Sequence, residues 1–158
     1  MSRMHLHVAV SDLDQSTRFY TALFGAEPTV VRPDYVKWEL TDPAVNFAIS
    51  NRGRAPGLDH LGIQAGSAEE LALLRARLEA ADIQGAAQEA TACCYARSDK
   101  YWVQDPQGLA WETFHTLGTV PTFNEGEGES RSAGACCVPT LPAAGVPVYL
   151  AVPGKPSA

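Results

Sequence analysis

The sequence lacks the features that mark membrane proteins and nucleic-acid-binding proteins. No stretch approaches the roughly 18 consecutive apolar residues of a membrane-spanning helix, so we expect no membrane partner. Basic residues are few: 12 Lys and Arg stand against 18 Asp and Glu, for a net charge of −6. A nucleic-acid partner would require a basic face, so we expect none. Residues 1–3 lead directly into a predicted strand, which favours a cytoplasmic protein.

Cysteine is scarce, and its spacing does not match a structural zinc site. The 4 cysteines form two adjacent pairs, Cys93-Cys94 and Cys136-Cys137, without the paired C-x-x-C pattern. A disulfide between neighbours strains the peptide between them, and the cytosol keeps thiols reduced, so we expect no disulfide framework. The pairs are therefore either dithiol chelates or coincidence.

The first two thirds of the 158 residues contain an internal repeat. Superposing His60 on His5, an offset of 55 residues, aligns a strand, a helix N-cap and an amphipathic helix in each half. Asp12 and Ser67 are the two aligned N-cap residues. The predicted strands are residues 4–10, 28–32, 35–41, 45–50, 59–65, 86–91, 95–104 and 109–116, and the predicted helices are residues 13–24 and 68–81. The fold class is α+β, built from a duplicated unit of one strand, one helix and three further strands.

The C-terminal quarter differs in composition. Residues 118–158 contain 12 Gly or Pro among 41 residues, a density at which a packed core does not form. We therefore predict a domain at residues 1–117, with module one at about residues 1–52 and module two at about residues 58–117. Residues 118–158, which include Cys136-Cys137, are expected to be largely disordered.

Three predicted strands each carry one group that suits a divalent metal. The repeat places His5 and His60 at equivalent positions. Glu112 lies between Ala110 and Phe114 on an inward face, which is unfavourable for a carboxylate unless it is paired or coordinated. Two histidines and one carboxylate form the facial triad of non-haem Fe(II) sites. Buried histidines satisfied by hydrogen bonds are the plain alternative, and the repeat favours the metal.

His7 is a local rival of His5. It lies two residues further along the same predicted strand, so both side chains point to one face. His7 is therefore either a ligand in place of His5 or a cavity residue that acts as an acid, a base or a substrate contact.

The Cys93-Cys94 pair predicts a thiophilic substrate beside this metal site, because thiolates bind soft species. Neighbouring side chains of an extended strand point to opposite faces. Chelation therefore requires a turn or a bulge at this pair. The alternative is that both cysteines are small buried hydrophobic residues.

Three segments of the chain resemble the vicinal-oxygen-chelate superfamily (glyoxalase, bleomycin resistance and extradiol dioxygenase). They are residues 5–20, Asp59-His60-Leu61-Gly62, and residues 105–112 with Trp111-Glu112. The resemblance covers about residues 1–117 and implies two βαβββ modules that curl into an open barrel around one metal, with His5 rather than His7 as the first ligand. The superfamily often has a fourth ligand where this chain has Asn46, Phe47, Ala48 and Ile49, so we expect a three-residue site with open positions.

A narrower resemblance, to the ArsI/CadI group, is carried by residues 1–3, 58–62, 91–96, 99–103 and 111–112. It implies an Fe(II)- and dioxygen-dependent C–As lyase that converts trivalent methylarsenicals into arsenite and formaldehyde. The implied iron ligands are His5, His60 and Glu112, and the implied substrate ligands are Cys93 and Cys94. The Cys136-Cys137 segment resembles the thiol-bearing tails of part of this group, with arsenic capture or no role as the two interpretations.

Two other functions stay open at this point. A protein that sequesters cadmium or arsenite would need the thiols but no open iron site. A different enzyme of the superfamily, such as an extradiol dioxygenase, an isomerase or a thiol transferase, would leave Cys93-Cys94 unexplained. The partners expected are a small organoarsenical and dioxygen, and a homodimer is one oligomeric state compatible with the sequence.

Overall fold

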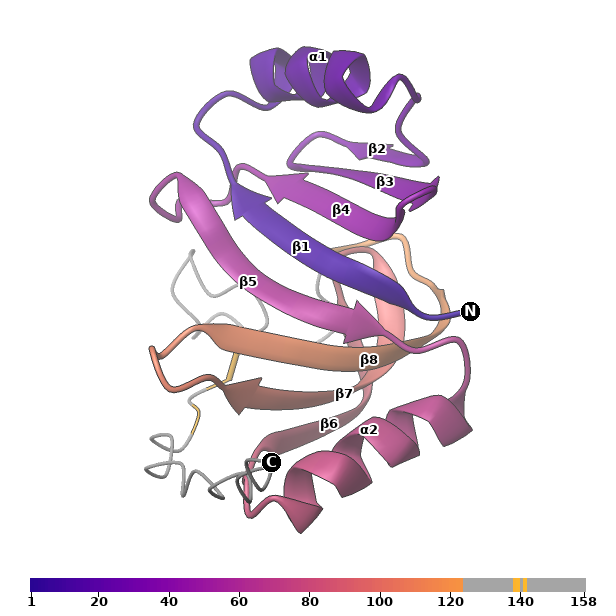
Figure 1. The fold of residues 1–158 in the computed structure, drawn as a ribbon. Helices are drawn as coiled ribbons and strands as arrows, with labels where there is room; N and C mark the ends of the chain where they lie inside the picture. Colours follow the sequence, from indigo (N-terminus) through magenta and orange to yellow (C-terminus); the bar gives the residue numbers. More distant parts are fainter. Residues whose placement is uncertain (124–137, 140, 142–158) are drawn as a thin grey trace, which may run out of the picture.

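The computed structural model describes residues 1–123, 138, 139 and 141 (Figure 1). Within them lie β1 (Arg3–Ala9), α1 (Leu13–Phe24), β2 (Val30–Arg32), β3 (Tyr35–Thr41), β4 (Ala44–Ser50), β5 (Gly57–Gln64), α2 (Ala68–Ala80), β6 (Ala86–Cys93), β7 (Ala96–Gln104) and β8 (Ala110–Thr119). The order and type of the predicted elements are confirmed. The largest difference is at β8, which continues three residues beyond its predicted end.

The strands form one eight-stranded sheet in the order β2-β3-β4-β1-β5-β8-β7-β6. Each half has the same internal order, because β1 lies beside β4 at the inner edge of one half and β5 lies beside β8 in the other. The sheet curls, with α1 at one end and α2 at the other (Figure 1). The α+β fold of two βαβββ modules is therefore confirmed, including its open-barrel shape.

Both predicted N-caps are present in the structure. The Asp12 side chain accepts a hydrogen bond from the backbone N–H of Gln15 at 2.8 Å, and the Ser67 hydroxyl accepts one from that of Glu70 at 3.3 Å. Each cap satisfies one of the N–H groups that the first turn of a helix leaves unpaired. The equivalent start of α1 and α2 keeps the two modules in register.

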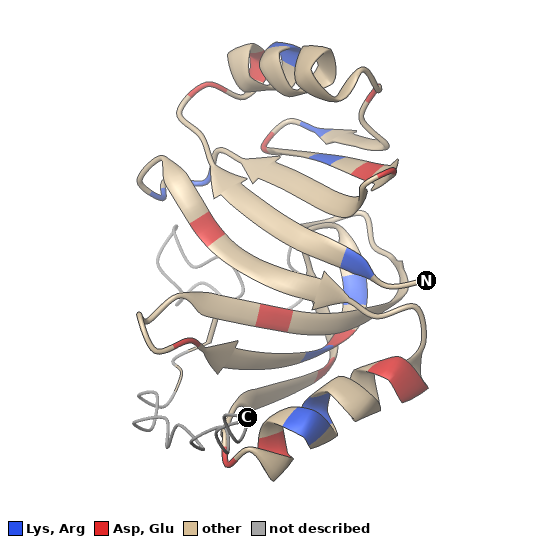
Figure 2. Cartoon of the chain, in the orientation of Figure 1, with Lys and Arg blue, Asp and Glu red and all other residues tan. Residues whose placement is uncertain are grey.

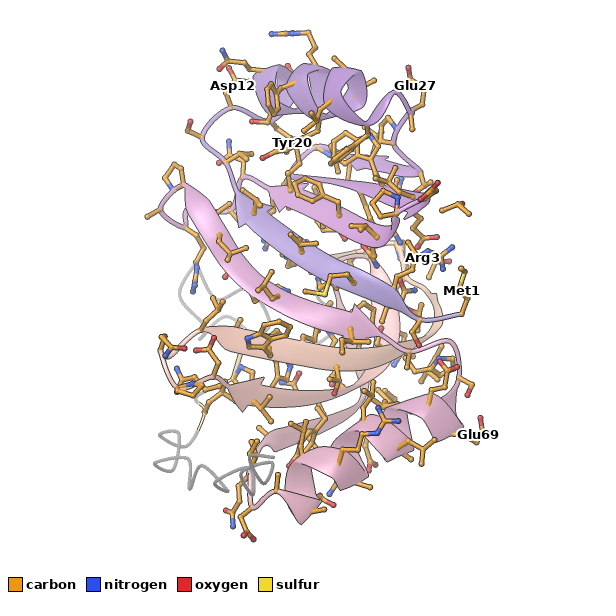
Figure 3. The ribbon with its side chains drawn as sticks, in the orientation of Figure 1. Met1, Arg3, Asp12, Tyr20, Glu27 and Glu69 are labelled. Atoms are coloured by element: carbon orange, nitrogen blue, oxygen red, sulfur yellow. The ribbon has the colours of Figure 1, made fainter. Side chains whose placement is uncertain are left out.

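The two faces of β1 have different neighbours. Leu6 and Val8 pack on the hydrophobic cluster beneath α1, whose buried members are Val36, Trp38, Phe47 and Ile49. Tyr20 of α1 points toward the sheet in Figure 3, and its ring lies 4.5 Å from that of Phe47. Since side chains alternate along a strand, the buried His5 and His7 lie on the opposite face. The sheet thus separates the apolar core under α1 from a polar interior.

The chain remains buried just beyond β8. Val120 and Phe123 are 8% and 6% exposed, and Phe123 packs in a cluster with Tyr35, Ala48 and Cys93. The predicted domain boundary at residue 117 and the tail stay predictions, because most of residues 118–158 lie outside the described part.

Charged residues are distributed unevenly over the fold. Figure 2 shows that the central strands carry few of them, with single acidic positions in β5 and β8, whereas α2 carries several. Within the described residues, neither helix is long and apolar enough to cross a membrane.

Candidate active site

One cavity in the polar interior brings the predicted site residues together. Its lining includes the three histidines of β1 and β5, Glu112 of β8 and both vicinal cysteines: His5, His7, His60, Glu112, Cys93 and Cys94. We call it the central cavity. The two modules contribute jointly, because β1 comes from the first and β5, β6 and β8 from the second.

Three ligand atoms in the central cavity lie close to one another. His5 Nε2 is 3.2 Å from His60 Nε2, and Glu112 Oε2 is 3.6 Å from the former and 3.5 Å from the latter. Donors that are each about 2.1 Å from one ion are roughly 3.0 Å apart at right angles and roughly 3.4 Å apart at tetrahedral angles. His5, His60 and Glu112, the metal triad, therefore fit a first-row divalent ion without large movement.

The register of β1 and β5 explains why the two histidines meet. In this antiparallel ladder His5 pairs with Gly62 and His7 pairs with His60. The sequence offset of 55 converts His5 into His60 and His7 into Gly62, so a local twofold axis relates the two strands. Ligands at equivalent positions of such a repeat are necessarily near its axis.

The same symmetry explains why only one carboxylate reaches the site. Glu112 on β8 is the register partner of Gly62 on β5, whereas Ala48 on β4 is the register partner of His7 on β1. Ala48 therefore occupies the position in module one that Glu112 occupies in module two. Because alanine has no donor atom, the described residues supply no fourth ligand at that position.

Gly62 permits the close approach of β5 and β8 beside Glu112. A Cβ atom at residue 62 would lie 2.1 Å from the backbone oxygen of Glu112, far inside contact distance. We expect Gly62→Ala to lower the free energy of unfolding by about 1–3 kcal/mol, because backbone must move to admit the methyl group. Urea unfolding measures this, and Gly118→Ala, which meets no atom within 4 Å, is the matched control. Equal stability of the two variants would contradict the prediction.

Hydrogen bonds orient the metal triad. His5 Nδ1 lies 3.1 Å from the carbonyl oxygen of Asn46, to which it donates in the neutral tautomer, and this leaves Nε2 with its lone pair toward the cavity. Lys100 Nζ donates to Glu112 Oε1 at 2.6 Å, so Oε2 is the oxygen that faces the histidines. The buried carboxylate of Asp59 lies 3.9 Å from Nδ1 of His60 and 3.0 Å from Arg54.

The electrostatics of the site favour the ligand forms of two members. Burial lowers the pKa of His5 to about 4, so its ring is neutral near pH 7 and can coordinate. Burial alone would raise the pKa of Glu112, but Lys100 and His60 outweigh it and hold that pKa well below its usual range. Burial also opposes the charged form of His60, but hydrogen bonds and charges from Asp59 and Glu112 raise its pKa overall.

His7 is the second candidate for a ligand. Donor atoms of His5, His7 and His60 lie within 4.8 Å of one another, and burial lowers the pKa of His7 to about 3. His7 Nε2, however, already lies 2.9 Å from the hydroxyl of Ser50, and the separations within the metal triad are shorter. The geometry therefore favours Glu112 as the third donor and places His7 in the cavity wall.

The vicinal cysteines lie at the hairpin between β6 and β7. Cys93 pairs with Ala96, so Cys94 and Tyr95 form a two-residue turn, and both have positive φ, at 56° and 62°. The turn brings the two Sγ atoms to 3.3 Å from each other. The expectation that chelation requires a turn at this pair is confirmed.

One expectation about the cysteines is wrong. Cys93 is disulfide-bonded in this structure, although we expected reduced thiols. The sequence argument excluded only a bond between neighbours, and it did not consider pairing between distant parts of the chain. Cys136-Cys137 lie outside the described residues. A Cys93-Cys94 dithiol therefore requires the reduced protein.

Two charged residues of the site were not assigned by the sequence. Lys100 and Asp59 stand in the motifs Asp99-Lys100 and Asp59-His60, but nothing in their spacing showed that they contact the triad. An aspartate directly before a ligand histidine, and a lysine in an otherwise apolar strand, were the available signals.

Comparisons with known proteins agree with this site. Residues 3–113 match the family model described as the Glyoxalase/Bleomycin resistance protein/Dioxygenase superfamily. The chain is 40% identical to the trivalent organoarsenical cleaving enzyme of Bacillus sp. strain MD1, over 87% of this chain and 84% of that protein. It is 34% identical to the cadmium-induced protein CadI of Mycobacterium tuberculosis, over 87% and 93%. The 2,3-dioxygenase LapB of Pseudomonas sp. KL28 shares the fold, with a TM-score of 0.58, 20% identity and coverage of 75% of this chain and 42% of that one.

Proposed function

Since the chain belongs to the glyoxalase/bleomycin resistance/dioxygenase superfamily, we propose that it is an Fe(II)- and dioxygen-dependent lyase that cleaves the carbon–arsenic bond of trivalent organoarsenicals. Methylarsenite is the proposed substrate, and arsenite and formaldehyde are the products. Relatives named as trivalent organoarsenical cleaving enzymes support this substrate class.

One observation carries the proposal: the vicinal cysteines and the metal triad line the same cavity. A dithiol is a soft ligand pair, and two histidines with one carboxylate form the donor set of non-haem iron sites. A substrate held by Cys93 and Cys94 therefore lies beside a position suited to a metal that reacts with oxygen. This combination fits C–As cleavage better than extradiol cleavage, which leaves the dithiol without a role.

The proposed role of the cysteines is to bind and orient the substrate. Methylarsenite, CH3As(OH)2, has two exchangeable hydroxyl groups, and each thiol proton leaves with one hydroxyl as water when an As–S bond forms. Two such bonds fix the arsenic and leave its methyl group as the free substituent. Holding the reacting group in one position lowers the entropic part of the barrier.

The proposed role of the metal triad is to hold Fe(II). Bound iron with three protein ligands supplies the activation of dioxygen. The hydrogen bond from His5 to the Asn46 carbonyl fixes the ring, and Lys100 keeps Glu112 ionised and oriented. The overall reaction, CH3As(OH)2 + O2 giving As(OH)3 + HCHO, balances without another reductant, because the carbon loses the four electrons that dioxygen gains.

Anaerobic reconstitution tests this function. The reduced protein is loaded with Fe(II), mixed with methylarsenite and then exposed to air, and the arsenic species are separated by chromatography. We expect arsenite and formaldehyde in equal amounts, and no product when oxygen or iron is omitted. Methylarsenite that stays intact under all these conditions would contradict the proposal.

Sequestration without turnover is the second candidate. The similarity to CadI and the soft dithiol favour it, because a chelating thiol pair also binds Cd(II) and arsenite. Tight binding of methylarsenite by the iron-loaded protein in air, with no release of arsenite, is the result that would support this function.

A further inference from the structure

The turn that presents the dithiol has an unfavourable backbone conformation. A two-residue hairpin turn with positive φ at both central positions usually carries Asn-Gly or a similar pair, because residues with a larger side chain avoid this region. Here Cys94 and Tyr95 occupy these positions, with φ of 56° and 62°. Contacts elsewhere in the fold must therefore stabilise the turn.

Tyr95 supplies such a contact to module one. Its hydroxyl donates a hydrogen bond to Oδ1 of Asp34 at 2.5 Å, and the other oxygen of Asp34 accepts from Arg52. Asp34 lies between β2 and β3, 61 residues before Tyr95. The backbone oxygen of Tyr95 also accepts from the N–H of Val120 at 3.0 Å. The turn is thus held through both the side chain and the backbone of one residue.

The ring of Tyr95 is packed among groups that also surround Cys93. It lies 5.9 Å from the ring of Tyr35 and 5.7 Å from that of Phe123, and the guanidinium of Arg32 is 5.3 Å from its centre. Tyr35 and Phe123 belong to the same buried cluster as Cys93. Any rotation of Tyr95 would therefore disturb the residues against which the first thiol packs.

The hydroxyl of Tyr95 stays protonated over the physiological range. Burial and the neighbouring Asp34 carboxylate both raise its pKa. A protonated phenol donates its hydrogen bond to an ionised carboxylate, which is among the stronger kinds of hydrogen bond in proteins.

We propose that Tyr95 is a positioning residue for arsenic chelation: its hydrogen bond to Asp34 lets module one fix the two thiols of the turn at the angle that one arsenic atom requires. This inference rests on the proposed function. It predicts that the affinity for arsenicals that take two thiolates depends on Tyr95 and Asp34, neither of which lines the central cavity.

A comparison of two arsenicals on the metal-free, reduced full chain tests this. Methylarsenite exchanges two hydroxyl groups and takes both thiolates, whereas dimethylarsenite exchanges one and takes a single thiolate. We expect Tyr95→Phe to weaken methylarsenite binding about tenfold, as for the loss of a hydrogen bond to a charged group. Dimethylarsenite affinity should change less than twofold, because one As–S bond needs no fixed angle between thiols. Tyr20→Phe removes a hydroxyl on α1 and should leave both affinities unchanged.

Double substitution identifies the partner. Asp34→Ala should weaken methylarsenite binding about as much as Tyr95→Phe, and the double variant should be no weaker than either, because both remove the same hydrogen bond. Wild-type affinity in Tyr95→Phe, equal loss for both arsenicals, or independent effects of the two substitutions would overturn the inference. Those results leave the proposed function intact, whereas methylarsenite affinity that survives Cys93→Ser and Cys94→Ser refutes the proposed function itself.

Discussion

Replacing Glu112 with alanine is expected to lower the affinity for Fe(II) and the rate of arsenite release by more than about 100-fold. Loss of a partner that only orients a ligand typically costs 10–100-fold in metal affinity or activity, and loss of a ligand costs more. The substitution also leaves Lys100 buried without the carboxylate that accepts its hydrogen bond at 2.6 Å. Methylarsenite binding should persist, because the dithiol lies on a different hairpin.

Three controls make this result specific to the metal. Glu112→Gln keeps the size of the side chain and its hydrogen-bonding oxygen, so it separates loss of the charged ligand from loss of packing. Glu79→Ala removes an exposed carboxylate of α2 that pairs with Arg75, and it should leave iron binding and turnover at wild-type levels. Urea unfolding checks that each variant is folded. Release of arsenite by Glu112→Ala at the wild-type rate would show that the iron assignment is wrong.

Replacing Cys93 or Cys94 with serine is expected to have the opposite effects. Affinity for methylarsenite should fall by about 10²–10⁴-fold, because the second As–S bond of a chelate is an intramolecular event with a high effective concentration. Fe(II) affinity should stay within about twofold, since no thiol belongs to the metal triad.

The measurement uses reduced protein, because Cys93 is disulfide-bonded in this structure. Titration of methylarsenite against the metal-free chain gives the affinity, and a separate Fe(II) titration shows whether the triad is intact. If both serine variants bind methylarsenite as the wild type does, the vicinal pair is not the substrate site. If either loses Fe(II) as well, the two sites are not independent.

The sequence by itself determined the elements and their duplication. Local signals specify these features: Asp12 and Ser67 cap helices through groups three residues away, and alternation along a strand places His5 and His7 on one face. The offset of 55 residues then related His5 to His60 without knowledge of the sheet. The demand for a turn at Cys93-Cys94 followed in the same way, from the geometry of neighbouring residues in a strand.

Only the tertiary structure decided which distant side chains meet. The ion pair of Lys100 with Glu112 depends on the register of β7 and β8, and the hydrogen bond of Tyr95 with Asp34 depends on how far the sheet curls. The packing of Phe123 beyond the last strand is decided in the same way. Such contacts join residues far apart in the chain, and their geometry depends on the twist and closure of the whole sheet. No local sequence period encodes that closure, so the groups that hold the site in place emerge only from the folded molecule.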